Sequence, residues 1–204
     1  MERVTLPQPK SNPNFIGSWI INPVSICDAL ITHFESNNRK QKKGVTLAGE
    51  NTDIKDSVDI LMFPEEITQS GNEVFKQYFN NLFSCYKDYV QEWPFLADFA
   101  TDLQIGEFNI QRYHGGQHYQ KIHTERDGLS SIHRLFAWMT YLNDVDIEEG
   151  GSTLFTHYDL EIQPKKGLTL IWPAEWTHAH KGGLLHSNCK YIITGWMHFP
   201  HNSG

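Results

Sequence analysis

The chain has 204 residues, with 17 Lys and Arg against 24 Asp and Glu and a formal net charge of −7. This length suits one domain with a substantial core, so we expect residues 1–204 to form a single domain. No apolar run approaches the length needed to cross a bilayer, which excludes a membrane-spanning protein. The acidic balance gives no electrostatic reason to bind nucleic acid, because phosphate contacts need a basic surface.

The first residues contain no apolar stretch typical of a secretory signal, and we therefore expect a cytoplasmic protein. The three cysteines, Cys27, Cys85 and Cys189, are odd in number and widely spaced. They fit neither a disulfide framework nor a paired-cysteine metal site, so we expect reduced thiols. The proline-containing stretch up to Pro13 is expected to be an extended arm.

Two amphipathic helices are predicted in the first half of the chain. Residues 23–42 carry apolar side chains at helical spacing, and Gly44 is placed to end that helix. The basic run 39–43 is expected to complement the helix C-terminus. Residues 71–92 repeat the pattern, and Pro94 is placed to stop the second helix.

After Asp98 the pattern changes to short β-prone runs separated by Gly, Pro, Asn and Asp. The predicted strands are Gly106 to Tyr113, Arg134 to Leu142, Ser152 to Thr156, Gly167 to Trp172 and Lys190 to Phe199. Helices followed by many short strands indicate an α+β fold, a double-stranded β-helix (jelly roll) barrel buttressed by N-terminal helices. We expect the helical support over about residues 15–98 and the jelly-roll core over about 99–200. Residues 44–70 are expected to form a loop or edge near the site entrance.

A metal site is indicated by His123 and Glu125, whose side chains project to the same side of an extended segment. Two imidazoles and one carboxylate form a three-ligand face that leaves positions open on Fe(II). His178 and His180 are both candidates for the remaining ligand, and Asp127 is an alternative oxygen donor. The spacing of His123 and Glu125 alone is weak evidence, because it arises often by chance.

Five features follow one another in an order that resembles the catalytic domain of prolyl 4-hydroxylases, within the iron(II) and 2-oxoglutarate oxygenase superfamily. They cover about residues 109 to 199, nearly half of the chain. The matching features are Tyr113 to Tyr119 around two glycines, the His123 and Glu125 pair, Arg134 to Leu142, the acidic Glu148 to Thr153, and His180 followed by Lys190 and by Gly195 to His198. One position departs from the pattern, since most prolyl hydroxylases have Asp where this chain has Glu125.

The resemblance implies Fe(II), 2-oxoglutarate and O2 as cofactors and co-substrates, with ascorbate as an accessory. His180 lies ten residues before Lys190, as the family pattern requires, so the resemblance favours His180 over His178 as the distal ligand. The implied roles are metal binding by His123, Glu125 and His180, 2-oxoglutarate binding by Tyr113, Thr153 and Lys190, and substrate binding by Tyr119, Arg134, Trp196 and His198. No role is expected for His157, His186 or His201.

Each implied role has a plainer structural alternative. Tyr113 and Tyr119 are also good β-formers, Trp196 is a natural core residue, and Arg134 could pair with a surface acid. Lys190 could be an edge lysine whose charged end reaches solvent.

We expect an oxygenase that hydroxylates a peptidyl proline of a protein or peptide substrate, with release of succinate and CO2. The same chemistry on a free amino acid or small metabolite is the alternative. A metal-binding jelly-roll interaction module without catalysis is the second alternative, although a structural zinc site would need a fourth protein ligand.

Overall fold

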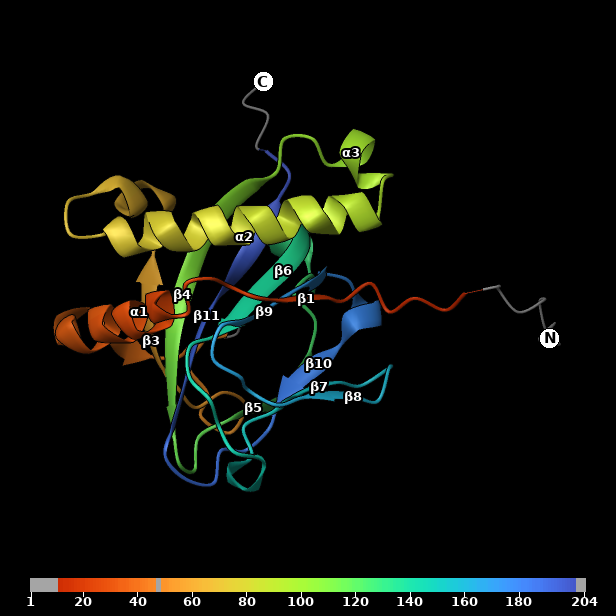
Figure 1. Ribbon diagram of the computed structural model, residues 1–204. Helices are drawn as coiled ribbons and strands as arrows, with labels where there is room; N and C mark the ends of the chain where they lie inside the picture. The colour runs from red at the N-terminus through yellow and green to blue at the C-terminus, as the bar shows by residue number, and fades with distance from the viewer. Residues whose placement is uncertain (1–10, 47–48, 201–204) are drawn as a thin grey trace, which may run out of the picture.

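The computed structural model describes residues 11–46 and 49–200, and two antiparallel β-sheets face one another in it (Figure 1). The large sheet has the order β1 (Gly17–Ile20), β9 (Leu168–Pro173), β6 (Arg134–Tyr141), β11 (Cys189–His198), β4 (Gln104–His114), β3 (Val58–Met62) and β2 (Lys42–Lys43). The small sheet has the order β5 (Tyr119–His123), β10 (His180–Gly182), β7 (Thr153–Phe155) and β8 (Leu160–Ile162). This arrangement confirms the predicted α+β jelly roll with N-terminal helical support.

Two helices, α1 (Ser25–Ser36) and α2 (Glu73–Glu92), cover the face of the large sheet that points away from the small sheet (Figure 1). A short helix, α3 (Leu96–Phe99), follows α2. Single 3-10 turns lie between other elements, at Asn38–Lys40, Pro64–Thr68, Leu129–Ser131, Ile147–Glu149 and Trp176–His178. No helix in residues 11–46 or 49–200 is long and apolar enough to cross a membrane.

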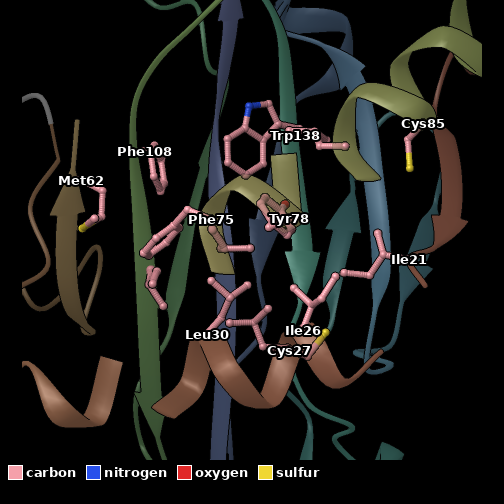
Figure 2. Close-up of a cluster of buried hydrophobic side chains, with 14 of the residues drawn as sticks. Ile21, Ile26, Cys27, Leu30, Met62, Phe75, Tyr78, Cys85, Phe108 and Trp138 are labelled. Atoms are coloured by element: carbon pink, nitrogen blue, oxygen red, sulfur yellow. The ribbon is translucent and has the colours of Figure 1, made fainter. Parts of the chain in front are cut away.

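Alternation along the strands of the large sheet divides the interior into two cores. On β6, Phe136 and Trp138 face the helices, whereas Ala137 and Met139 face the small sheet. Figure 2 shows the helix-side core, in which side chains of α1, such as Leu30, and of α2, such as Tyr78, lie against the large sheet that carries Trp138. The second core lies between the sheets, and this is the side on which a ligand cavity opens.

A buried hydrogen-bond chain ties α2 to the sheet inside the helix-side core. The Tyr78 hydroxyl lies 2.8 Å from Oγ1 of Thr140, which lies 2.7 Å from Oγ1 of Thr169. All three side chains are fully buried. Because buried hydroxyls need hydrogen-bond partners, this series of hydrogen bonds fixes the position of α2 over β6 and β9 more precisely than apolar contact alone.

The first helix ends earlier than predicted, at Ser36 instead of Lys42, and residues 42–43 form β2. The reason lies at Asn37, whose side chain donates to the His33 carbonyl at 2.7 Å, while Gln41 donates to the Phe34 carbonyl at 2.9 Å. These side chains satisfy the last helical carbonyls, which would otherwise need a further turn. The second helix confirms its prediction within two residues.

The predicted strands correspond to β4, β6, β7, β9 and β11, whereas the prediction missed β1, β2, β5, β8 and β10. Residues 44–70 contain β3, which lies between β4 and the edge strand β2 of the large sheet. The three cysteines are free thiols, as expected. Of the expected N-terminal arm, residues 1–10 lie outside the described residues.

Leu82 and Phe83 provide a matched pair for testing the helix-side core. Leu82 is 1% exposed and packs on the sheet, whereas its neighbour Phe83 is 58% exposed on the outer face of α2. We expect Leu82→Ala to lower the free energy of unfolding by about 2–5 kcal/mol, since it removes apolar contact and leaves a cavity. Phe83→Ala should change it by less than about 1 kcal/mol in the same urea titration. Equal losses of unfolding free energy in the two variants would contradict the buried position of Leu82 and the exposed position of Phe83.

Candidate metal centre and co-substrate cavity

Three side chains from the small sheet and its loop converge on one point. His123 ends β5, His180 begins β10, and their Cα atoms are directly paired across the two strands. Glu125 follows β5 by two residues, and its Oε1 lies 3.3 Å from His180 Nε2 and 3.9 Å from His123 Nε2. The ligand atoms of all three lie within 4.8 Å of one another. The structure therefore brings together the three residues that the sequence analysis named as a triad.

Hydrogen bonds fix which nitrogen of each imidazole faces that point. His123 Nδ1 lies 2.9 Å from the Lys121 carbonyl, and His180 Nδ1 lies 2.9 Å from the His178 carbonyl. This leaves both Nε2 atoms directed at Glu125. Backbone partners of this kind are typical of metal-ligating histidines, because they set the tautomer and hold the ring.

The protonation states of the triad side chains suit the binding of a metal cation. Burial, with the nearby His180, lowers the pKa of His123 to about 4, so its imidazole is neutral at pH 7. Burial raises the pKa of Glu125, but hydrogen bonds and charges from His180, His123 and Trp196 outweigh it and hold this pKa at about 2. Nitrogen and carboxylate donors on one face, with the other positions open, fit Fe(II).

The glutamate, one methylene longer than aspartate, is held at both ends. Its Oε2 accepts a 2.7 Å hydrogen bond from Trp196 Nε1, and its backbone carbonyl accepts one of 3.0 Å from Arg134. The Arg134 guanidinium in turn lies 3.5 Å above the Trp196 ring. Arg134 and Trp196, expected to contact substrate, therefore also support the carboxylate of Glu125.

The two alternative ligands lie elsewhere. His178 Nε2 lies 2.7 Å from the Asn14 carbonyl, on the N-terminal segment. Asp127 lines the cavity, but its carboxylate accepts a 3.0 Å hydrogen bond from Ser131 and does not join the three-residue group found among the described residues. The geometry thus favours His180 over His178.

A cavity of about 800 Å³ opens beside the triad, and Lys190 lies at its inner end. This side chain is 4% exposed, and its ammonium donates a 2.8 Å hydrogen bond to the Gly151 carbonyl. It also lies 4.6 Å from the Tyr113 ring centroid. Burial lowers the pKa of Lys190 to about 8. A buried ammonium without a carboxylate partner among the described residues fits the carboxylate of a bound co-substrate.

Two hydroxyl side chains line the same cavity as this ammonium, and a glycine pair lies beside it. Gly150 and Gly151 have φ of 74° and 70°, values that favour glycine, and this turn presents the Gly151 carbonyl to Lys190. Thr153 follows on β7, where its Oγ1 accepts a 2.7 Å hydrogen bond from Tyr141. The Tyr113 hydroxyl donates to Gln111 at 2.9 Å. Tyr113, Thr153 and Lys190 all line the cavity, as their expected roles require.

The residues expected at the substrate divide into two groups. Tyr119, Arg134 and Trp196 line the cavity, and the Tyr119 ring stacks on the His123 ring at 3.9 Å between centroids. His198 is not part of the lining; its ring packs 5.1 Å from that of His133. Every second residue of β11 from Lys190 to Trp196 lines the cavity, and the lining ends there, before His198.

A buried ion pair in the cavity wall escaped the sequence analysis. Lys55 lies 2.6 Å from Asp59, which also accepts hydrogen bonds from Ser57 and Gln111. The Lys55 ammonium lies 5.8 Å from the centroid of Tyr119, the ring stacked on His123. The sequence signal was the alternation of Ser57 and Asp59 with apolar residues, which places both on the inner face of β3.

Shortening the glutamate tests its attachment to Trp196. Glu125→Asp withdraws the carboxylate by about one bond, ~1.5 Å, and so breaks either the contact with Trp196 or the approach to the histidines. We expect Fe(II) to bind about tenfold more weakly under anaerobic titration. Trp196→Phe should weaken binding to a similar degree, whereas Asp127→Asn should not. A large loss in Asp127→Asn would instead assign the oxygen ligand to Asp127.

Lys190→Met should stabilise the protein while removing co-substrate binding. The folded pKa of Lys190, about 8, lies below the ordinary lysine value of 10.5, so the buried charge costs stability at neutral pH. That cost falls as the pH rises from about 8 towards 10.5. At pH 7 we expect the free energy of unfolding of the variant to be about 1–3 kcal/mol higher than that of the parent protein. Above pH 10.5 the two values should differ little. Calorimetry with added 2-oxoglutarate should show binding to the parent protein alone; a destabilised variant that still binds would contradict this assignment.

Comparisons with known proteins agree with this geometry. Residues 108–198 match the sequence model of the 2OG-Fe(II) oxygenase superfamily, a stretch that includes all three members of the triad and Lys190. A search of curated proteins finds no match. The resemblance inferred from the ordered motifs is confirmed, and the family match with the His-Glu-His group supports Fe(II) and 2-oxoglutarate as cofactors.

Several solved structures share the fold at low sequence identity. A Pseudomonas putida prolyl-4-hydroxylase is 16% identical, with a TM-score of 0.70 over 92% of this chain and 94% of its own. A viral collagen prolyl hydroxylase from Paramecium Bursaria Chlorella virus-1, solved with 2OG, is 18% identical, with a TM-score of 0.62 over 90% and 95%. A prolyl hydroxylase from Trichoplax adhaerens, in complex with a hypoxia inducible factor peptide fragment, is 18% identical, with a TM-score of 0.66 over 89% and 83%. Residues 108–198 are thus similar in sequence to 2OG-Fe(II) oxygenases, and the chain has the fold of prolyl hydroxylases.

Proposed function

We propose that the chain is an Fe(II)- and 2-oxoglutarate-dependent dioxygenase that hydroxylates a peptidyl proline and releases succinate and CO2. The observation that carries this proposal is the pairing of two features in one cavity, the triad His123, Glu125 and His180 and the uncompensated buried charge of Lys190. A metal-binding interaction module would need the triad but would have no use for a buried ammonium that costs stability.

The residues that line the cavity would bind the metal and the two ends of the co-substrate. Fe(II) with 2-oxoglutarate and O2, when bound, supplies the oxidising power for inserting one oxygen atom into a C–H bond. His123, Glu125 and His180 would hold the metal, and Lys190 would bind the far carboxylate of 2-oxoglutarate. The hydroxyls of Tyr113 and Thr153 would supply hydrogen bonds to the same carboxylate. Fixing both ends of the co-substrate sets its orientation before the substrate arrives.

The substrate side of the cavity would be formed by Tyr119, Arg134 and Trp196. Arg134 and Trp196 are held against one another and against Glu125, so their positions are fixed without substrate. Their rigid, partly apolar surface suits a ring such as proline and keeps water from the reacting C–H bond. The size of the cavity and the peptide bound to the Trichoplax adhaerens structure support a peptide over a free amino acid.

The direct test is turnover of peptides by the iron-loaded protein. With proline-containing peptides, 2-oxoglutarate and O2, we expect succinate in equal amount to a product that is one oxygen atom heavier, and no product from His180→Ala. His178→Ala should keep most of the activity, because that ring lies outside the triad. Succinate release stimulated by free amino acids but by no peptide would overturn the peptidyl substrate. Absence of succinate with every substrate would overturn the dioxygenase itself.

A further inference from the structure

The cavity mouth concentrates positive charge in a protein that is acidic overall. Eight of the described cavity-lining residues are Lys or Arg and five are Asp or Glu, whereas the whole chain has 17 and 24. The basic run 39–43 was expected to complement the end of the first helix, yet that helix ends at Ser36 and four residues of the run line the cavity. Apart from Lys190 and Arg134, the function proposed above does not use these positive charges.

Strand geometry aims two of these lysines into the cavity. Lys42 on β2 is the pairing partner of Asp59, whose side chain faces the cavity, so Lys42 lies on the same face of the sheet. On β5, Tyr119, Lys121 and His123 alternate with outward residues and all three line the cavity. Lys42 and Lys121 therefore approach the mouth from the large and the small sheet respectively.

Some of the lining cations are already neutralised. Lys40 lies 2.7 Å from Glu66, Lys43 lies 3.0 Å from Glu50, and Lys55 lies 2.6 Å from Asp59. Arg39, Lys42 and Lys121 are exposed, and none of them forms an ion pair with another residue of the described ranges. Three positive charges at the mouth are thus available to a ligand, separate from Lys190 at the inner end.

Apolar side chains lie beside these charges. Leu61 and Phe63 line the cavity at the β3 side and are 43% and 46% exposed. A surface that combines apolar side chains with unpaired cations matches a peptide with apolar and acidic residues. A nucleic acid is a poorer match, because Glu66, Glu107 and Asp127 share the lining and the chain is acidic overall.

We propose that the mouth of the cavity recognises an acidic peptide segment, with Arg39, Lys42 and Lys121 binding Asp or Glu side chains next to the residue presented to the triad. This inference rests on the proposed peptide hydroxylation and names the class of sequence that the enzyme selects. The attraction acts between exposed groups, so it strengthens encounter and selectivity and weakens with added salt.

The test compares three labelled peptides that share one central proline and differ in its flanking residues, which are Asp and Glu, Asn and Gln, or Lys. Binding is measured by fluorescence anisotropy with the protein loaded with Mn(II) and 2-oxoglutarate. We expect the acidic peptide to bind about tenfold more tightly than the amide peptide at low salt, with the difference shrinking at about 0.5 M salt.

Two double variants test the residues. Lys42→Glu with Lys121→Glu should reverse the preference towards the Lys-flanked peptide, and Lys42→Gln with Lys121→Gln should abolish it. The backbone carbonyl of Lys121, which holds His123, remains in both. The matched control is Lys76→Glu with Lys87→Glu on the exposed side of α2, which makes the same charge change outside the cavity and should leave the preference intact.

The outcomes separate this inference from the proposed function. If the parent protein produces succinate equally well with amide and acidic peptides and binds them equally, the acidic-peptide inference is wrong and the dioxygenase stands. If a single-stranded oligonucleotide displaces the acidic peptide at lower concentration than unlabelled peptide does, the mouth binds nucleic acid and the inference is wrong. If no peptide binds and no succinate forms, both fail together.

Discussion

Strand β11 lies at the centre of the large sheet, and its alternation of side chains determines both the stability and the site of this protein. Ile193 and Met197 point to the helix-side core, while Lys190 and Trp196 point to the cavity. The neighbouring strands β4 and β6 repeat this division. Because one face is committed to packing against α1 and α2, the other face is free to carry polar side chains.

The cavity places opposite charges at fixed separations. Glu125 is ionised beside two imidazoles, and Lys190 stands at the inner end without a carboxylate partner among the described residues. The Lys55–Asp59 pair forms part of the cavity wall. A buried, poorly paired ammonium opposes folding, so its presence is easier to understand as a binding feature than as a structural one. The stability of the helix-side core, with its fully buried aromatic side chains, offsets that cost.

Much of the fold was accessible from sequence patterns because its main elements are long and regularly patterned. Strands β4, β6, β9 and β11 were predicted from β-prone runs bounded by turns. The prediction missed β5 and β10, since they are short and their sequences are polar, and only pairing with one another defines them. The predicted end of α1 was wrong because the Asn37 and Gln41 side chains cap the last helical carbonyls. The orientation of these side chains cannot be inferred from the sequence.

The candidate site was predictable only in part from the residues themselves. The spacing of His123 and Glu125 indicated a clamp, but the choice of His180 needed the resemblance, and the structure adds the reason that His178 is bound to the Asn14 carbonyl. His198, expected at the substrate, lies two residues beyond Trp196, where the cavity lining along β11 ends. Lys55 and Asp59 could not be foreseen as a pair, since their burial depends on tertiary packing.

The central claim is that one cavity holds both a metal, on His123, Glu125 and His180, and a 2-oxoglutarate molecule anchored by Lys190. The most direct measurement is the visible absorption spectrum of the protein with Fe(II) and 2-oxoglutarate in the absence of oxygen. We expect the weak charge-transfer band of an iron-chelated 2-oxo acid, lost in Lys190→Met at moderate 2-oxoglutarate concentration and lost in His180→Ala, but retained in His178→Ala. A spectrum without the band in the parent protein, or a band that disappears in His178→Ala and survives in His180→Ala, would contradict it.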